Sequence, residues 1–67
     1  MAPNPTKREL EVLEKIAQGL TTRQIAFELK ITLKTVMSHR GHLLDKFDAH
    51  NSALLVRRAI ATGFVEP

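Results

Sequence analysis

The sequence contains no cysteine, tryptophan or tyrosine, and only three glycines and three prolines among its 67 residues. Without cysteine the chain can form neither a disulfide framework nor a thiolate metal site. No apolar run approaches the roughly 20 residues that a membrane-spanning helix needs. The polar N-terminus also lacks the apolar segment of a signal peptide. We therefore expect a protein of the cytoplasm that has no membrane partner.

The length of 67 residues predicts a single domain. A chain this short buries only part of its surface, so its stability is modest. A hydrophobic content of 43% is still enough for one small core. No internal repeat or low-complexity segment divides the sequence.

The positive charge is concentrated in the middle of the chain. Residues 19–47 carry five cations against two acidic residues, which accounts for the whole net charge of +3. The five cations are Arg23, Lys30, Lys34, Arg40 and Lys46. A positive surface of this kind favours polyanions as partners. A solvated charged surface is the alternative explanation.

Side-chain caps and glycine stops divide the chain into helices. The residues that suit N-caps are Thr6, Thr21, Thr32 and Asn51. Two of them form capping boxes, with Glu9 and Gln24 three residues later. Gly19 and Gly63 follow the last apolar positions of two helices. The expected helices span about 7–18, 22–29, 33–46 and 52–62.

These elements predict an all-α fold, a compact four-helix domain over residues 6–65. Residues 1–5 are expected to form a flexible lead-in or the end of a linker. The second and third helices are joined by only a few residues, as in a helix-turn-helix.

Apolar residues at helical spacing predict the inner face of each helix. The expected inward positions are Val12, Leu13, Ile16, Ala17, Ile25, Ala26, Leu29, Val36, Leu43, Leu44, Phe47, Leu55, Val56 and Ala59. Ile31 should anchor the turn before the third helix. Phe64 and Val65 should fold back onto the core, and Phe27 lies outside the apolar stripe.

The third helix leaves cations and short hydrogen-bonding side chains outside its apolar stripe. The positions expected to face outward are Lys34, Thr35, Met37, Ser38 and Arg40, with His39 near the boundary. Cations neutralise phosphates, and hydroxyl and guanidinium groups can reach base edges. This combination indicates the recognition helix of a DNA-binding domain.

The chain also resembles a known family over about Thr6 to Val65. The resemblance is carried by Thr6-x-Arg8-Glu9-x-x-Val12-Leu13, Ala17-x-Gly19-Leu20-Thr21, Ile25-Ala26-x-x-Leu29-x-Ile31, Lys34-Thr35-Val36-x-x-His39-Arg40 and Leu43-x-x-Lys46-Phe47. These blocks look like the LuxR-type helix-turn-helix domain, the C-terminal domain of NarL/FixJ response regulators and of quorum-sensing regulators. The resemblance implies a bacterial transcription regulator, located at the nucleoid, whose third helix enters the major groove of double-stranded DNA.

The resemblance also implies roles for single residues. The implied phosphate contacts are Thr22, Arg23, Thr35, His39 and Lys46, and the implied base contacts are Lys34, Met37, Ser38 and Arg40. The implied partners are DNA, a second copy of the chain bound weakly through the fourth helix, and RNA polymerase.

The sequence departs from the family pattern at four positions. Met37 stands where a cation is usual, so it can offer only apolar contact, for example to a thymine methyl. Gly41 stands mid-helix where a polar side chain is common. Pro5 replaces the usual leucine before the first cap, and Phe47 replaces the final leucine of the third helix.

Each functional role has a simpler alternative. Lys34 and Arg40 can be solvated charges, the Thr35 hydroxyl can bond within its helix, and Met37 can be a rim residue. His39, His42 and Asp45 have a spacing that suggests a metal, but a zinc site usually needs more converging ligands. We therefore expect no metal and no cofactor.

On the fourth helix, four residues lie away from the apolar stripe and are expected to be exposed in a dimer contact: Ala53, Leu54, Arg57 and Ile60. No nucleophile–base pair or carboxylate dyad stands out, so we expect no enzyme activity. A protein-interaction module on the same scaffold is the competing function, motivated by apolar residues expected at the surface, Phe27, Met37 and Leu54.

Overall fold

The computed structural model describes residues 3–67, which form four helices and no strand. The helices are α1 (Lys7–Ala17), α2 (Thr22–Leu29), α3 (Leu33–Lys46) and α4 (Ser52–Ala61). The predicted all-α fold is confirmed. Two helices end one residue earlier than predicted, because Gln18 and Thr62 are C-caps. Met1 and Ala2, part of the predicted lead-in, lie outside the described residues.

All four predicted N-caps are confirmed. Thr6 Oγ1 accepts from the Glu9 N–H at 3.1 Å, and Glu9 Oε1 accepts from the Thr6 N–H at 2.8 Å. Thr21 and Gln24 repeat this capping box with the same two distances. The remaining caps are those of Thr32 and Asn51. Each cap accepts from an N–H that the start of a helix leaves without a partner. The cap and this N–H are three residues apart, so a short stretch of sequence determines where each helix begins.

The helix ends are only partly those predicted. Gly19 and Gly63 follow α1 and α4 with φ of 89° and 82°, a conformation that suits glycine. The chain leaves α2 differently, because Lys30 takes the left-handed conformation with φ of 57° although it is not glycine. This conformation costs about 1–2 kcal/mol. The Ile31 N–H bonds to Ala26 O at 3.0 Å, and the Ile31 side chain packs against the core, so both hold the turn.

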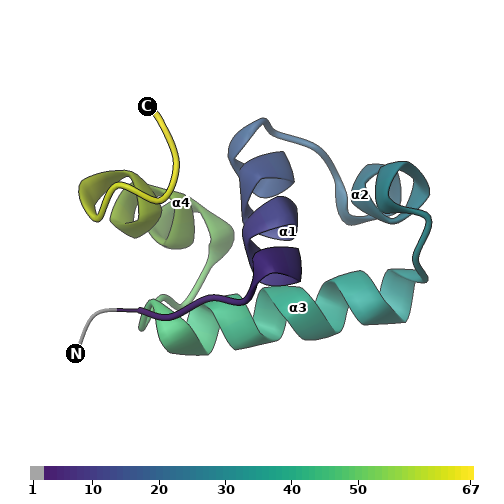
Figure 1. Cartoon of the computed structure of the whole chain (residues 1–67), viewed down its shortest axis with the longest axis horizontal. Helices are drawn as coiled ribbons and strands as arrows, with labels where there is room; N and C mark the ends of the chain where they lie inside the picture. Colours follow the sequence, from purple (N-terminus) through teal and green to yellow (C-terminus); the bar gives the residue numbers. More distant parts are fainter. Residues whose placement is uncertain (1–2) are drawn as a thin grey trace.

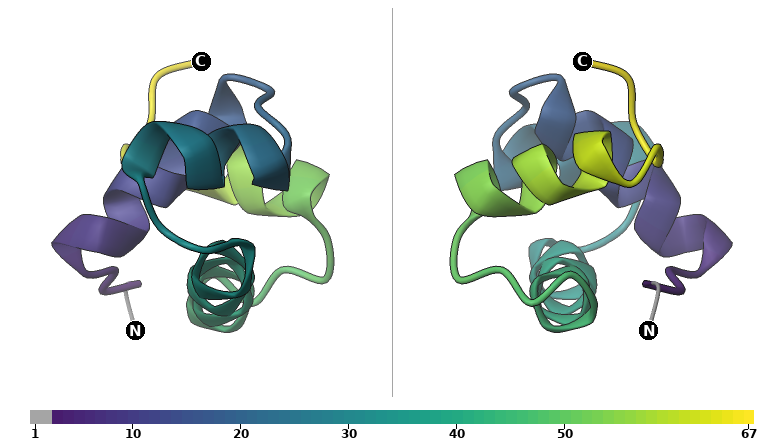
Figure 2. Two further views of the ribbon diagram at one scale, coloured as in Figure 1. Left: turned by 90° about the vertical axis from the view of Figure 1, so that its right-hand side faces the viewer. Right: turned by 90° about the vertical axis from the view of Figure 1, so that its left-hand side faces the viewer.

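Three helices lie on one side of the fourth. In Figure 1, α3 runs along the lower edge, and α1, α2 and α4 lie above it. Both end-on views of α3 in Figure 2 show the other helices above it and none below. The described part of the chain measures 30 × 21 × 20 Å. One side of α3 is therefore left uncovered along its length.

The core follows the predicted stripes with three exceptions, one on α1 and two on α4. The buried apolar residues are Val12, Leu13, Ile25, Val36, Leu43, Phe47, Ala49, Leu55 and Ala59. Ala17, predicted to face inward, is half-buried and lies outside the core cluster. Phe64 packs edge-on against Phe47 with ring centroids 5.5 Å apart, so the predicted return of the C-terminal segment is confirmed. Val56, predicted to face inward, is half-buried and is not part of the core cluster. Leu54, predicted to be exposed, packs against the core cluster. No helix among the described residues is long and apolar enough to cross a membrane.

Gly41 in the middle of α3 is a position where a side chain can be added. A Cβ at this position meets no atom within 4 Å. We expect Gly41→Ala to raise the free energy of unfolding by about 1 kcal/mol, because alanine favours the helix over glycine by this amount. Urea unfolding followed by circular dichroism measures the difference.

Gly63→Ala is the matched control. A Cβ at Gly63 also meets no atom within 4 Å, but its φ is +82°. This variant should lose about 1 kcal/mol, since a side chain disfavours the left-handed conformation. Destabilisation by Gly41→Ala would mean that α3 is irregular at this point.

Candidate nucleic-acid interface

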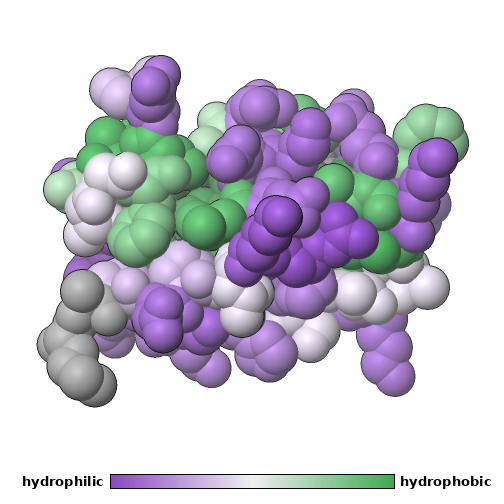
Figure 3. Space-filling view, in the orientation of Figure 1, coloured by the Kyte–Doolittle hydropathy of each residue, from purple (hydrophilic) through white to green (hydrophobic). Residues whose placement is uncertain are grey.

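The uncovered side of α3 carries mainly polar and small side chains. Its exposed residues are Leu33, Lys34, Met37, Ser38, Gly41, His42 and Asp45. Figure 3 shows hydrophilic and neutral side chains along the lower edge of the molecule, where α3 lies, and apolar ones mainly higher up. The predicted outward positions of Lys34, Met37 and Ser38 are confirmed, with Met37 59% exposed. The 14 residues of α3 give a rod about 21 Å long.

Arg40 does not face outward as predicted. Its Nε and Nη2 donate to Ser52 Oγ, at 2.9 and 2.7 Å, at the start of α4. The reason is its position on the helix, four residues after Val36 and three before Leu43, which places it beside the buried stripe. Its guanidinium therefore reaches α4 along the edge of the uncovered side. No local pattern indicates Ser52 as its partner, since the two residues are 12 positions apart.

A shallow groove joins α2 to the middle of α3. It has a volume of about 530 Å³, and its lining includes Thr22, Met37, Arg40, Gly41 and Ser52. The structure thus brings together three of the predicted DNA-contacting residues from two helices. Arg23 follows Thr22 in the first turn of α2 and is exposed. The first turn of a helix carries free N–H groups and a partial positive charge, both of which suit a phosphate.

Thr35 is engaged within its own helix. Its hydroxyl lies 2.8 Å from the hydroxyl of Thr32, and its N–H donates to the same atom at 3.1 Å. The simpler alternative for this residue, a bond near the start of the helix, is therefore present. Thr35 was predicted to face outward, but it is half-buried at the edge of α3.

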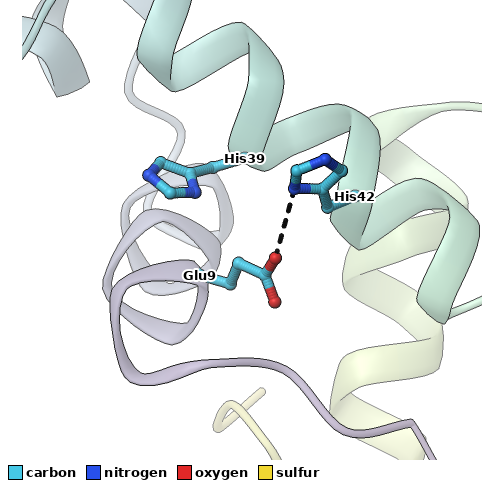
Figure 4. A group of neighbouring side chains, drawn as sticks. All are labelled: Glu9, His39 and His42. Atoms are coloured by element: carbon cyan, nitrogen blue, oxygen red, sulfur yellow. Dashed lines mark ion pairs between the residues drawn. The ribbon is translucent and has the colours of Figure 1, made fainter.

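A polar seam lies between α1 and α3, around Glu9. This carboxylate is only 3% exposed, although the sequence singled it out only as a capping residue. Its Oε1 accepts from Lys46 Nζ at 2.6 Å, and its Oε2 lies 3.5 Å from His42 Nδ1. Figure 4 shows His39 and His42 on α3 beside Glu9 on the first turn of α1. We call Glu9, His39, His42 and Lys46 the α1–α3 seam.

The seam holds Glu9 in its charged form. Burial raises the pKa of the Glu9 carboxyl, but the hydrogen bonds from Lys46 and the Thr6 N–H and the charges of Lys46 and His42 outweigh it. The net pKa therefore lies below its ordinary value.

Lys46, an implied phosphate contact, is already bonded inside the protein. Its ammonium donates to Glu9 Oε1 and, at 3.1 Å, to Asn4 O of the segment before α1. An ammonium has three donors, so one remains for another acceptor. The side chain is one-third exposed, which leaves this donor within reach of solvent.

The residues expected at a dimer contact differ in exposure. Ala53 and Arg57 are exposed as predicted. Leu54 and Ile60 are half-buried rather than exposed, and Leu54 packs against the core because the start of α4 lies close to it. The apolar area that α4 can offer to a second copy is therefore smaller than the sequence indicated.

Known proteins share this domain as a part of a longer chain. Over 53 residues the chain is 47% identical to the transcriptional regulatory protein UhpA of Escherichia coli. The aligned segment covers 79% of this chain and 27% of UhpA. It is 40% identical over 58 residues to the response regulatory protein YgeK of Escherichia coli, covering 87% of this chain and 40% of YgeK. The transcriptional regulatory protein FixJ of Rhizobium meliloti is 39% identical to the chain over 59 residues, which are 88% of this chain and 29% of FixJ. The chain thus spans less than half the length of each of these relatives.

The family model described as bacterial regulatory proteins of the luxR family matches residues 5–59. This family consists of DNA-binding domains of transcription regulators and not of enzymes, in agreement with the expectation of no catalytic activity. The match covers most of the chain and includes α1, α2, α3 and most of α4. The chain therefore belongs to the luxR family of bacterial regulatory proteins.

Proposed function

We propose that the domain binds a specific site on double-stranded DNA by placing the uncovered side of α3 in the major groove. The observation that carries this proposal is the position of α3, which has three helices packed behind it and none in front. A B-DNA major groove is about 12 Å wide and admits one α-helix. The exposed side of α3 fits this use because it carries Lys34 and Ser38, with Leu33 and Met37 as its large apolar side chains.

Within this arrangement, base contacts come from Lys34, Met37 and Ser38. Lysine donates to guanine, a serine hydroxyl reaches either kind of base, and methionine offers an apolar contact to a thymine methyl. Arg40 reaches a base only if its guanidinium breaks the hydrogen bonds with Ser52 Oγ. A base contact by Arg40 therefore competes with its contact to the start of α4. Backbone contacts that fix the orientation come from Thr22, Arg23, Thr35, His39 and the remaining donor of Lys46.

We further propose that two copies meet on DNA through α4, with Ala53, Leu54, Arg57 and Ile60 in the contact. The half-buried state of Leu54 and Ile60 leaves little apolar area, so the pairing is weak and is populated on DNA. A two-fold dimer would place two α3 helices in successive major grooves. The relatives named above are regulators of greater length, which supports a role as the output domain of a cytoplasmic two-component response regulator that acts on RNA polymerase at the nucleoid.

An in vitro selection from a random pool of duplexes tests this function. We expect an enriched inverted or direct repeat whose half-sites lie about one helical turn apart. Lys34→Ala should then weaken binding to the selected site by about 1–3 kcal/mol and relax the preference at one base position. Fluorescence anisotropy with labelled duplexes measures both effects.

Arg58→Ala is the matched control, because it removes one exposed cation of α4 to which the proposed arrangement assigns no contact with DNA. It should leave the affinity unchanged. A pool without sequence preference would contradict specific recognition by this domain. Equal losses for Lys34→Ala and Arg58→Ala would contradict the placement of α3 in the groove.

A protein-interaction module is the second candidate, favoured by one observation. Phe27 on α2 is 86% exposed, which is unusual for a side chain of this size. Chemical shifts centred on Phe27 with a protein partner, and none with DNA, would support this function instead. Leu54, which motivated this alternative, packs against the core and no longer contributes to it.

A further inference from the structure

Three possible metal ligands meet at the α1–α3 seam. His39 and His42 are three residues apart on α3, so their side chains project from the same side of the helix. Glu9 approaches from the first turn of α1 (Figure 4). One ligand atom from each of the three residues lies within 4.8 Å of the others. The sequence alone could not indicate this group, because Glu9 is distant in the chain, and Asp45, considered with the histidines, is not part of it.

The donor set determines which ion would fit. Two imidazole nitrogens and one carboxylate oxygen suit borderline cations such as Zn²⁺, whereas Mg²⁺ and Ca²⁺ prefer oxygen ligands only. Ligands at zinc bond lengths lie about 3.4 Å apart in tetrahedral geometry. The widest separation in the group must therefore contract by up to about 1.4 Å. The His42 side chain is 60% exposed, so it can rotate to close this distance.

The two carboxylate oxygens of Glu9 have different surroundings. Oε1 accepts hydrogen bonds from Lys46 Nζ at 2.6 Å and from the Thr6 N–H at 2.8 Å. Oε2 faces His42 and remains available for a metal. Hydrogen bonds to a ligand's other atom hold that ligand in place, which favours binding. The ammonium beside the carboxylate repels a dication, so the affinity should be micromolar rather than that of a buried structural site.

From these contacts we propose that Glu9 Oε2, His39 and His42 form a surface site for Zn²⁺. Three protein ligands leave the fourth tetrahedral position to water. The site lies beside the uncovered side of α3, but the proposal does not depend on DNA binding.

Isothermal titration of the domain without a histidine tag tests the site. With Zn²⁺ as the probe, we expect one ion per chain at micromolar affinity. His42→Ala should weaken this binding at least tenfold. His50→Ala is the matched control, because it removes another exposed histidine from a turn outside the seam and should leave the affinity unchanged.

Amide chemical shifts recorded during a zinc titration show where on the domain the ion binds. We expect the largest changes at Glu9, His39 and His42, and no comparable change with Mg²⁺ or Ca²⁺ at the same concentration. Wild-type affinity in a folded His42→Ala variant would overturn the proposal. So would a loss of affinity in His50→Ala, or shifts centred outside the seam.

Discussion

Raising the salt concentration from about 50 to 200 mM is expected to weaken binding of two copies to their DNA site about 10²-fold. The reason is the release of counterions from the phosphates that the protein neutralises. Each copy offers two cations to the backbone in the proposed arrangement: Arg23 and Lys46. Two copies therefore neutralise about four phosphates, and a slope of about −0.9 for each phosphate gives a loss of about two decades over this change in salt.

Arg23→Ala sharpens this test. It should reduce the slope of log affinity against log salt by about one for each copy on the DNA. Anisotropy titrations at several salt concentrations give the slope. Arg58→Ala should leave it unchanged. An affinity that varies little with salt would contradict phosphate contact as the main source of binding.

Glu9→Ala is expected to lower the free energy of unfolding by about 2–4 kcal/mol. Loss of the capping-box bond to Thr6 contributes about 1 kcal/mol. Loss of the charged hydrogen bond with Lys46 contributes most of the rest, reduced because the Lys46 side chain is one-third exposed. A domain of this size has a total stability of roughly 3–10 kcal/mol, so the variant should be close to unfolding at moderate urea concentrations.

Glu14→Ala is the matched control, because it removes an exposed carboxylate from the same helix. It should change stability little. The pH dependence gives a second readout. Because the pKa of Glu9 is lowered in the folded state, its contribution is present above the ordinary value of about 4.5 and is lost as the pH falls through the lowered pKa. Wild-type stability should fall in this acid range more steeply than that of Glu9→Ala, and parallel curves would contradict a paired Glu9.

The helix starts could be predicted because their signals are local. A threonine or asparagine cap and the N–H that it accepts are three residues apart, so the sequence contains the whole interaction. The position of α3 as the helix with the exposed polar side followed from apolar spacing alone. The predicted positions of Lys34, Met37 and Ser38 on that side are therefore correct.

The interactions that the sequence did not reveal join distant residues. Lys46 and Glu9 are 37 residues apart, and no helical pattern relates them. Arg40 was predicted to face outward because helical spacing alone does not show where α4 lies. The hydroxyl of Ser52, the first residue of α4, accepts the hydrogen bonds of its guanidinium. Leu54 was predicted to be exposed for the same reason. The left-handed Lys30 was missed because glycine is the usual signal for that conformation.

The short range of the four N-caps has a consequence for folding speed. Each cap closes a loop of three residues, and the backbone bonds of the helices close loops of four, so little chain entropy opposes their formation. Proteins built mainly from such near contacts fold within microseconds to milliseconds. The domain should therefore refold within this time once denaturant is removed, and the edge-on contact between Phe47 and Phe64 should form in the same step.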